Sequence, residues 1–187
     1  MSERNKIVLL LTSYNARGHT NILAKSFIKG VEDAGGEVEF IHIGAMNISG
    51  CRGCNGCSKT HSCVVNDGLM PIIEKIRDAN IVVFASPVYF GNFNSTMKAV
   101  IDRLYCLDRT SLIPHCTVLL MTGDGGEITR RGGRKNFEPA RYSYRSAFGY
   151  LDWEDRGIVI AEHIETNEDV VNSKAYQDAY ELGKALA

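Results

Sequence analysis

The sequence has almost no net charge and no long apolar run. Its 21 basic and 22 acidic residues leave a net charge of -1, so charge gives no reason to expect nucleic acid or an acidic membrane surface as a partner. No apolar stretch approaches the length of a membrane span. The run over 7–11 is also too short for a signal peptide, and no small-residue cleavage site follows it, which predicts a cytoplasmic protein.

Two nucleotide-binding signatures are missing from the turn that follows the first apolar run. This turn, TSYNARGHT over 12–20, resembles a Walker A loop in spacing. However, Ser13 replaces the first glycine and His19 replaces the lysine, and without that lysine a triphosphate loses its β/γ partner, which argues against ATP and GTP. The dinucleotide pattern G-x-G-x-x-G is absent from the turn as well.

What is present predicts one globular domain, 1–187, with alternating strands and helices. Five short apolar or alternating runs have the composition of strands, at 6–11, 38–42, 81–85, 116–121 and 158–161. Amphipathic stretches follow them, so we expect a parallel sheet covered on both faces. The predicted fold is α/β: a flavodoxin-like three-layer sandwich, its five-stranded parallel sheet in the order 2-1-3-4-5. The central strand is expected to stop at Ser86-Pro87, because proline offers no N–H.

Three loops would meet at the carboxyl edge of this sheet, where such folds bind ligands. The loop 13–20 offers hydroxyls and N–H groups at a helix N-terminus, which favour an anion such as a single phosphate. The loop 86–94 carries adjacent aromatics, typical of contact with a planar ligand, and 123–126 is glycine-rich. A monophosphate site beside an aromatic loop and a glycine-rich loop suits FMN.

The candidate FMN-binding residues come from these three loops. They are Ser13, Asn15, Arg17, Gly18, His19, Thr20, Pro87, Val88, Tyr89, Phe90, Gly91, Asn92, Gly123 and Asp124. Ser13, Asn15 and Thr20 are suited to the phosphate, whereas His19 is expected to face solvent rather than contact it. Tyr89 and Phe90 could border the isoalloxazine ring, although on their own they would equally suit a loop tucked under its helix. No catalytic side chain is required, because flavin N5 accepts the electrons.

Six cysteines in a chain expected to be cytoplasmic are more typical of reduced, metal-bound or redox-active thiols than of disulfides. Cys51, Cys54, Cys57 and Cys63 form C-x2-C-x2-C-x5-C, and the glycines between them permit tight turns. Such thiolates can wrap one iron–sulfur cubane. Zinc, a thioredoxin-like dithiol and a loop of free thiols remain open. The segment follows the second strand, so we expect it on the same edge as the flavin. The other two cysteines, Cys106 and Cys116, are expected in the core.

The chain resembles the NADPH-dependent FMN reductase family. The stretches 86–91 (SPVYFG), 97–99 (MKA) and 101–103 (IDR) look like its SPVY-G…KA-iDR hallmark, and the cysteine segment resembles the iron–sulfur flavoprotein-like branch. The resemblance implies a flavodoxin-like fold, bound FMN, NAD(P)H as co-substrate, a 4Fe-4S cluster on the four cysteines, and a homodimer or homotetramer. The sequence departs from the family in the phosphate loop, usually G-S-P-R-x-x-G-N-T, and at Asp67-Gly68, where an acidic pair is usual.

The predicted function is therefore an FMN-binding oxidoreductase that transfers electrons between a nicotinamide or protein donor and a small or protein acceptor. The alternative is an iron–sulfur flavoprotein that carries electrons between a cysteine-bound cluster and FMN. A flavin-binding or thiol-sensing module without turnover also remains open. A basic run could hold an NADPH 2′-phosphate, but we favour a solvated charged surface. It comprises Arg130, Arg131, Arg134, Lys135, Arg141 and Arg145.

Overall fold

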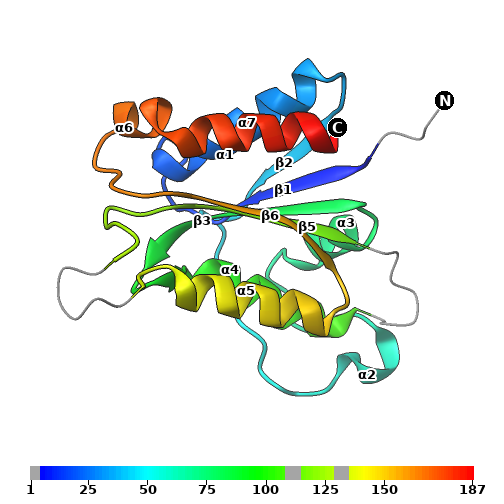
Figure 1. Cartoon of the computed structure of the whole chain (residues 1–187). Helices are drawn as coiled ribbons and strands as arrows, with labels where there is room; N and C mark the ends of the chain where they lie inside the picture. Colours follow the sequence, from blue (N-terminus) through cyan, green and yellow to red (C-terminus); the bar gives the residue numbers. More distant parts are fainter. Residues whose placement is uncertain (1–4, 108–114, 129–134) are drawn as a thin grey trace.

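The computed structural model describes residues 5–107, 115–128 and 135–187, and Figure 1 shows a sheet between two layers of helices. Its parallel strands are β1 (Ile7–Leu11), β2 (Val38–His42), β3 (Ile81–Tyr89), β5 (Cys116–Thr122) and β6 (Glu154–Ala161). They lie in the order β2-β1-β3-β5-β6, and the two-residue β4 (Asn92–Phe93) pairs antiparallel with β3 off this path. With β4 left aside, the predicted order 2-1-3-4-5 is confirmed.

The helices divide between the two faces of the sheet. On one face lie α1 (His19–Asp33), α6 (Asn167–Asn172) and α7 (Lys174–Leu186); on the other lie α3 (Met70–Arg77), α4 (Ser95–Arg103) and α5 (Glu138–Tyr150). A 3-10 turn, η1 (Leu104–Cys106), extends α4, and the short α2 (Cys57–Thr60) lies outside this layer. None of the helices in the described ranges is long and apolar enough to cross a membrane.

Burial on both faces explains why the central strands are continuous apolar runs. Every residue of β1 is buried, and β3 is buried from Ile81 to Ser86. Alternate side chains enter two separate cores: Leu10 and Phe84 pack under α3, α4 and α5, whereas Leu9 and Val83 pack under α1 and α7. The edge strand β2 is only half-buried, as its alternating sequence predicts. The layered core therefore fixes the carboxyl ends of the strands along one edge.

The central strand does not stop at Ser86-Pro87, so that prediction is wrong. β3 continues to Tyr89, and Pro87 pairs with Thr122 of β5. Pro87 is tolerated because its nitrogen faces β1 and not β5. The pairing of β3 with β1 ends at Ala85, whose carbonyl accepts the Thr12 N–H at 2.8 Å, so no partner there needs an N–H from Pro87. The strand then turns back into β4 at Phe90 and Gly91.

Phe90 and Gly91 form a two-residue hairpin turn with positive φ angles of 51° and 77°. This is the geometry of a type I′ turn, which normally uses Asn-Gly or Asp-Gly. A phenylalanine at positive φ costs about 1–3 kcal/mol of backbone strain, a cost typical of functional sites. The Phe90 side chain is fully exposed and Tyr89 is also exposed. The predicted aromatic loop is thus a tight hairpin whose two aromatic side chains are exposed.

Candidate functional site

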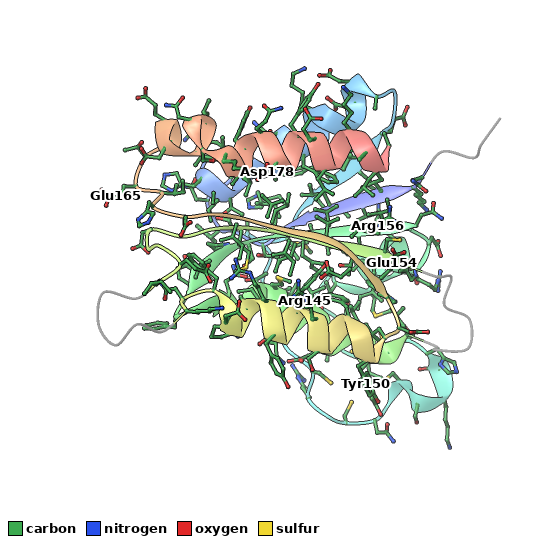
Figure 2. The ribbon with its side chains drawn as sticks, viewed as in Figure 1. Arg145, Tyr150, Glu154, Arg156, Glu165 and Asp178 are labelled. Carbon is green, nitrogen blue, oxygen red and sulfur yellow. The ribbon has the colours of Figure 1, made fainter. Side chains whose placement is uncertain are left out.

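The three predicted loops border one hollow at the carboxyl edge of the sheet. Its volume is about 610 Å³. It is lined by His19, Val88, Tyr89, Phe90, Gly123, Asp124, Ile164 and Glu165. Figure 2 places Glu165 at the left edge, where the chain passes from β6 to α6. Ile164 and Glu165 belong to a fourth loop that was not predicted from the sequence, since no apolar or glycine signal marks it.

The remaining candidate residues do not line the hollow themselves. They are Ser13, Asn15, Arg17, Gly18, Thr20, Pro87, Gly91 and Asn92. Asn92 faces α5, where its side chain donates to Ser143 Oγ at 3.1 Å. Thr20 is buried, and its hydroxyl lies 2.7 Å from the Thr122 hydroxyl, directly before Gly123. Thr20 thus ties the first loop to the third, and its contact with a phosphate stays a prediction.

The first loop folds into a tight turn at the start of α1. The Asn15 side-chain oxygen accepts the Arg17 N–H at 3.0 Å, and the Asn15 carbonyl accepts the Gly18 N–H at 3.1 Å. Gly18 is the N-cap of α1 and has no side chain with which to cap it. The first-turn N–H groups of α1 and the positive end of its dipole are therefore suited to an anion.

His42, the last residue of the edge strand β2, and Gly44, two residues beyond it, support this turn from behind. His42 Nε2 lies 2.7 Å from the Ser13 carbonyl oxygen. Gly44 lies so close that a Cβ there would be 2.0 Å from the same oxygen. Sequence reasoning assigned neither residue to the site, because the contact depends on the pairing of β2 with β1. The Ser13 carbonyl is consequently held on a fixed path.

Asn94 connects the first and second loops, although it is not among the site residues predicted from the sequence. Its side-chain nitrogen donates to the Thr12 carbonyl at 2.7 Å, and its backbone N–H donates to Ser86 Oγ at 3.0 Å. Its side-chain oxygen accepts the Met97 N–H at 3.0 Å and caps α4. An asparagine before an amphipathic run is a recognisable helix start, but its bonds to two strands are not visible in the sequence.

The third loop is held by backbone bonds to the fourth. The Ile164 N–H donates to the Gly123 carbonyl at 3.0 Å, and the His163 N–H donates to the Gly125 carbonyl at 3.1 Å. The basic run beyond it falls partly outside the described residues, which exclude Arg130, Arg131 and Arg134. Arg141 pairs with Glu127 and Glu138, and the exposed Arg145 pairs with Asp155. These partners favour a solvated charged surface.

The four cysteines of the segment line a second hollow, of about 620 Å³. Cys51 and Cys54 are exposed, and Cys57 and Cys63 are half-buried. Asp102 and Tyr105, near the end of α4, line the same hollow, whereas the loops after β1 and β3 meet the start of α4 at Asn94. Because α4 has nine residues, Asn94 and Asp102 lie about 12 Å apart along its axis. The expectation that the cysteines share the flavin edge is therefore wrong: the segment leaves that edge and runs along α4 (Figure 1).

The donor set of this second hollow fits an iron–sulfur cluster in its chemistry. Four thiols are the ligands that such clusters use. Among the described residues, no three Cys, His, Asp or Glu side chains converge on the position of one metal ion. A Cβ at Gly50 or Gly53 would meet nothing within 4 Å, so the backbone there has space to draw the thiols together. The four cysteines thus line one hollow without converging on a single-metal position.

The other two cysteines differ from each other. Cys106 is buried in the core as expected, and burial, together with the neighbouring Cys63 and Cys57, raises its thiol pKa to about 11. It stays protonated at neutral pH. Cys116 was expected in the core but is only partly buried at the start of β5, with its Sγ 3.7 Å from Glu154 Oε2. Cys116 is the first residue of β5, and the apolar pattern of the strand does not show that burial begins only at the next residue.

Comparisons with known proteins show the family of the chain. The model of the family described as NADPH-dependent FMN reductase matches residues 5–135. An iron–sulfur flavoprotein of Methanocaldococcus jannaschii is 30% identical over 98 residues, which cover 52% of this chain and 51% of that protein. One from Archaeoglobus fulgidus is 34% identical over 98 residues, covering 52% and 48%. The chain thus spans about half the length of the curated relatives it matches.

Solved structures resemble the whole fold. An FMN-dependent NADH-azoreductase from Bacillus anthracis, in complex with FMN, superposes with a TM-score of 0.75 at 16% identity, covering 98% of this chain and 99% of that one. An NAD(P)H:quinone oxidoreductase from Methanothermobacter marburgensis gives a TM-score of 0.74 at 14% identity, covering 99% and 100%. At these identities the likeness shows the fold alone.

Proposed function

Because the chain belongs to the NADPH-dependent FMN reductase family, as its motifs predict, we propose that it is an FMN-dependent oxidoreductase with FMN in the hollow at the carboxyl edge. One observation carries this proposal: loops from three strands, predicted separately, border a single hollow beside the N-terminus of α1. A flat cofactor with one phosphate needs such a combination of an anion site and an apolar wall.

Each part of the hollow has a role in this proposal. The first turn of α1, with Ser13 and Asn15, would hold the phosphate. Val88 and Tyr89 would border the ring, and the Gly123 backbone would face its polar edge. The bound flavin would supply the redox chemistry by accepting electrons from NADPH or NADH and passing them to an acceptor. The protein's part is to orient the ring and to tune its potential through hydrogen bonds and nearby charge.

The phosphate assignment is tested by removing the two hydroxyls. We expect the double variant Ser13→Ala/Thr20→Val to bind FMN at least about tenfold more weakly in a fluorescence titration, a loss of ~1.4 kcal/mol. Thr117→Val is the matched control, because Thr117 is buried on the same strand as Thr122 but at its opposite end. Unchanged FMN affinity in the double variant would remove the phosphate site from these loops.

Turnover is tested separately from binding. Stopped-flow mixing of the FMN-loaded protein with NADPH or NADH should bleach the flavin absorbance rapidly. A protein that binds FMN tightly but is not bleached by either nucleotide would be a binding module and not a reductase. The assembly of two or four chains also stays a prediction, which light scattering of the FMN-loaded protein can test.

A second candidate function is supported by the cysteine segment. Four thiols line one hollow, and the curated relatives named above are iron–sulfur flavoproteins. In this version the chain carries electrons between a cluster on Cys51, Cys54, Cys57 and Cys63 and the flavin. Iron and sulfide analysis after anaerobic purification tests it. Fewer than about one iron per chain would contradict it, because a cubane on four cysteines holds four.

A further inference from the structure

A buried arginine lies at the point where the cysteine segment meets the core. Arg103 ends α4, and its side chain is fully buried. Its Nη1 donates to the Asp67 carboxylate at 2.6 Å and to the Ser49 carbonyl at 3.2 Å. Its Nη2 donates to the Val65 carbonyl at 3.1 Å. One guanidinium therefore binds three positions that are distant from it in the sequence.

These three positions bracket the four cysteines. Ser49 lies just before Cys51, and Val65 lies just after Cys63. Asp67 also accepts the Ser49 N–H at 2.8 Å, so the two ends of the segment are bonded to each other as well as to Arg103. Both ends of the segment are therefore hydrogen-bonded to the same guanidinium and to each other. The loop that carries the cysteines is thus closed at its ends by two contacts, the Ser49–Asp67 bond and the shared Arg103 guanidinium.

The segment between these ends has little other support. Nearly all of its residues from 50 to 64 are exposed, and its regular structure is the single turn α2. Its hydrogen bonds mostly join neighbours, such as Thr60 Oγ1 and the Ser62 carbonyl at 3.1 Å, and the Cys63 N–H donates to Met70 Sδ at 3.3 Å at the start of α3. Such a loop has no core of its own, so without closure at its ends it would sample many open conformations.

The charges at the closure are balanced. Burial alone would raise the pKa of Asp67, but the Ser49 N–H, the Arg103 guanidinium and the Leu69 N–H hold it below its ordinary value. Asp67 is thus ionised at neutral pH, opposite a permanently charged partner. One carboxylate oxygen of Asp67 accepts the Leu69 N–H at 3.3 Å just before α3, and the other accepts from Arg103. A lysine could satisfy one of these partners but lacks the fork that reaches all three.

We propose that Arg103, together with Asp67, is the positioning residue that closes the cysteine segment around its hollow. The evidence for the closure is the set of hydrogen bonds described above. Only the identity of the group that the thiols bind rests on the second candidate function. In that function Arg103 sets how well the four thiols are gathered for a cluster, without contacting the flavin.

The test compares Arg103→Met and Arg103→Lys with Arg145→Met, an exposed arginine on α5 that serves as control (Figure 2). The first measurement is the rate of trypsin cleavage at Arg52 and Lys59 in protein without iron. Cleavage of a transiently open loop follows its open population, so we expect it to rise about tenfold or more in Arg103→Met, and less in Arg103→Lys. The control should match the wild type.

The second measurement is iron retained per chain after anaerobic incubation with ferrous iron and sulfide. We expect Arg103→Met to retain about a tenth of the wild-type iron under limiting iron, Arg103→Lys an intermediate amount, and both to keep the FMN affinity within about twofold. A general loss of structure would lower FMN binding as well. Lower iron retention with unchanged FMN affinity therefore identifies a positioning role.

The outcomes separate the inference from the proposed function. If the wild type binds no iron but Arg103→Met is cut faster, the cluster fails and the closure stands. If Arg103→Met keeps the wild-type cleavage rate and iron content, the closure is refuted. Should Arg103→Met not fold, Arg103→Lys and Asp67→Asn decide the question by the same two measurements. Wild-type behaviour in both of these variants would refute the closure equally.

Discussion

Replacing Gly44 by alanine tests whether the path of the first loop decides FMN binding. A Cβ at this position would lie 2.0 Å from the Ser13 carbonyl oxygen and 2.7 Å from that of Thr12. Real Cβ atoms essentially never approach within 3.0 Å, so the loop or the strand end must move by about 1 Å. Gly44 cannot retreat freely, because its N–H donates to the Leu11 carbonyl at 3.0 Å. We therefore expect the loop to move and to strain the contact of His42 with Ser13.

A displacement of about 1 Å in a binding loop can lower the efficiency of a site by up to about 100-fold. We expect Gly44→Ala to weaken FMN binding by about 10- to 100-fold, which is ~1.4–2.8 kcal/mol of binding free energy. The assay is fluorescence titration of FMN into the purified apoprotein at fixed salt. Urea unfolding of the same sample shows that the protein titrated is folded.

Gly149→Ala is the matched control, because it is a helical glycine where a Cβ meets nothing within 4 Å. It should leave the FMN affinity unchanged and stabilise the fold by about 0.5–1 kcal/mol. If Gly44→Ala binds FMN as tightly as Gly149→Ala does, the loop at Ser13 does not hold the cofactor. The phosphate site would then have to lie elsewhere on the edge.

Three further predictions concern the fold and its coupling to the site. Gly183→Ala should destabilise the protein by about 3 kcal/mol in urea unfolding, because a Cβ there would lie 2.1 Å from the Phe27 carbonyl oxygen; a shift below about 0.5 kcal/mol would contradict this. Burial lowers the pKa of His115 below its ordinary 6.5, so its stabilising contribution is complete above pH 6.5 and is lost as the pH falls toward the folded-state pKa. The urea midpoint should therefore fall between pH 6.5 and 5, and the fall should be smaller in His115→Phe; equal slopes would refute the assignment. Asn94→Ala should cost about 1–2 kcal/mol of stability through the lost cap and should weaken FMN binding without lowering iron retention; equal losses of both ligands would show a general defect instead.

The sequence predicted the sheet well because its strands obey local rules. The buried runs at β1, β3 and β5 are continuous and apolar, and the alternation with helices leaves few strand orders open. The features that it did not predict depend on contacts between segments that are distant in the sequence. Pro87 indicated the end of a strand because proline lacks an N–H. The sequence does not show that its nitrogen faces β1 at a point where β1 has already ended. Phe90 gave no turn signal because a phenylalanine at positive φ is rare.

The candidate site divides in the same way. The three loops were predictable, because the carboxyl ends of parallel strands share an edge whatever the side chains are. The residues that fix those loops were not, since Gly44 contacts Ser13 only through strand pairing, and Asn94 reaches Thr12 across the start of a helix. The cysteine spacing showed the donor set but not its position. Arg103 belongs to the hallmark stretch 101–103, but the sequence does not show that its guanidinium bonds to Ser49 and Val65 at the two ends of the cysteine segment.

The helix α4 connects the two parts of the molecule that the proposed chemistry needs. Its first turn is capped by Asn94, which bonds to the loop after β1, and its last residue is Arg103, which bonds to both ends of the cysteine segment. A helix is stiff along its axis, so the distance between the flavin-side hollow and the cysteine hollow is set by the length of α4 and not by either loop. The family hallmark stretches 97–99 and 101–103 lie on this helix. In this chain the helix thus joins the loop after β1 at one end to both ends of the cysteine segment at the other.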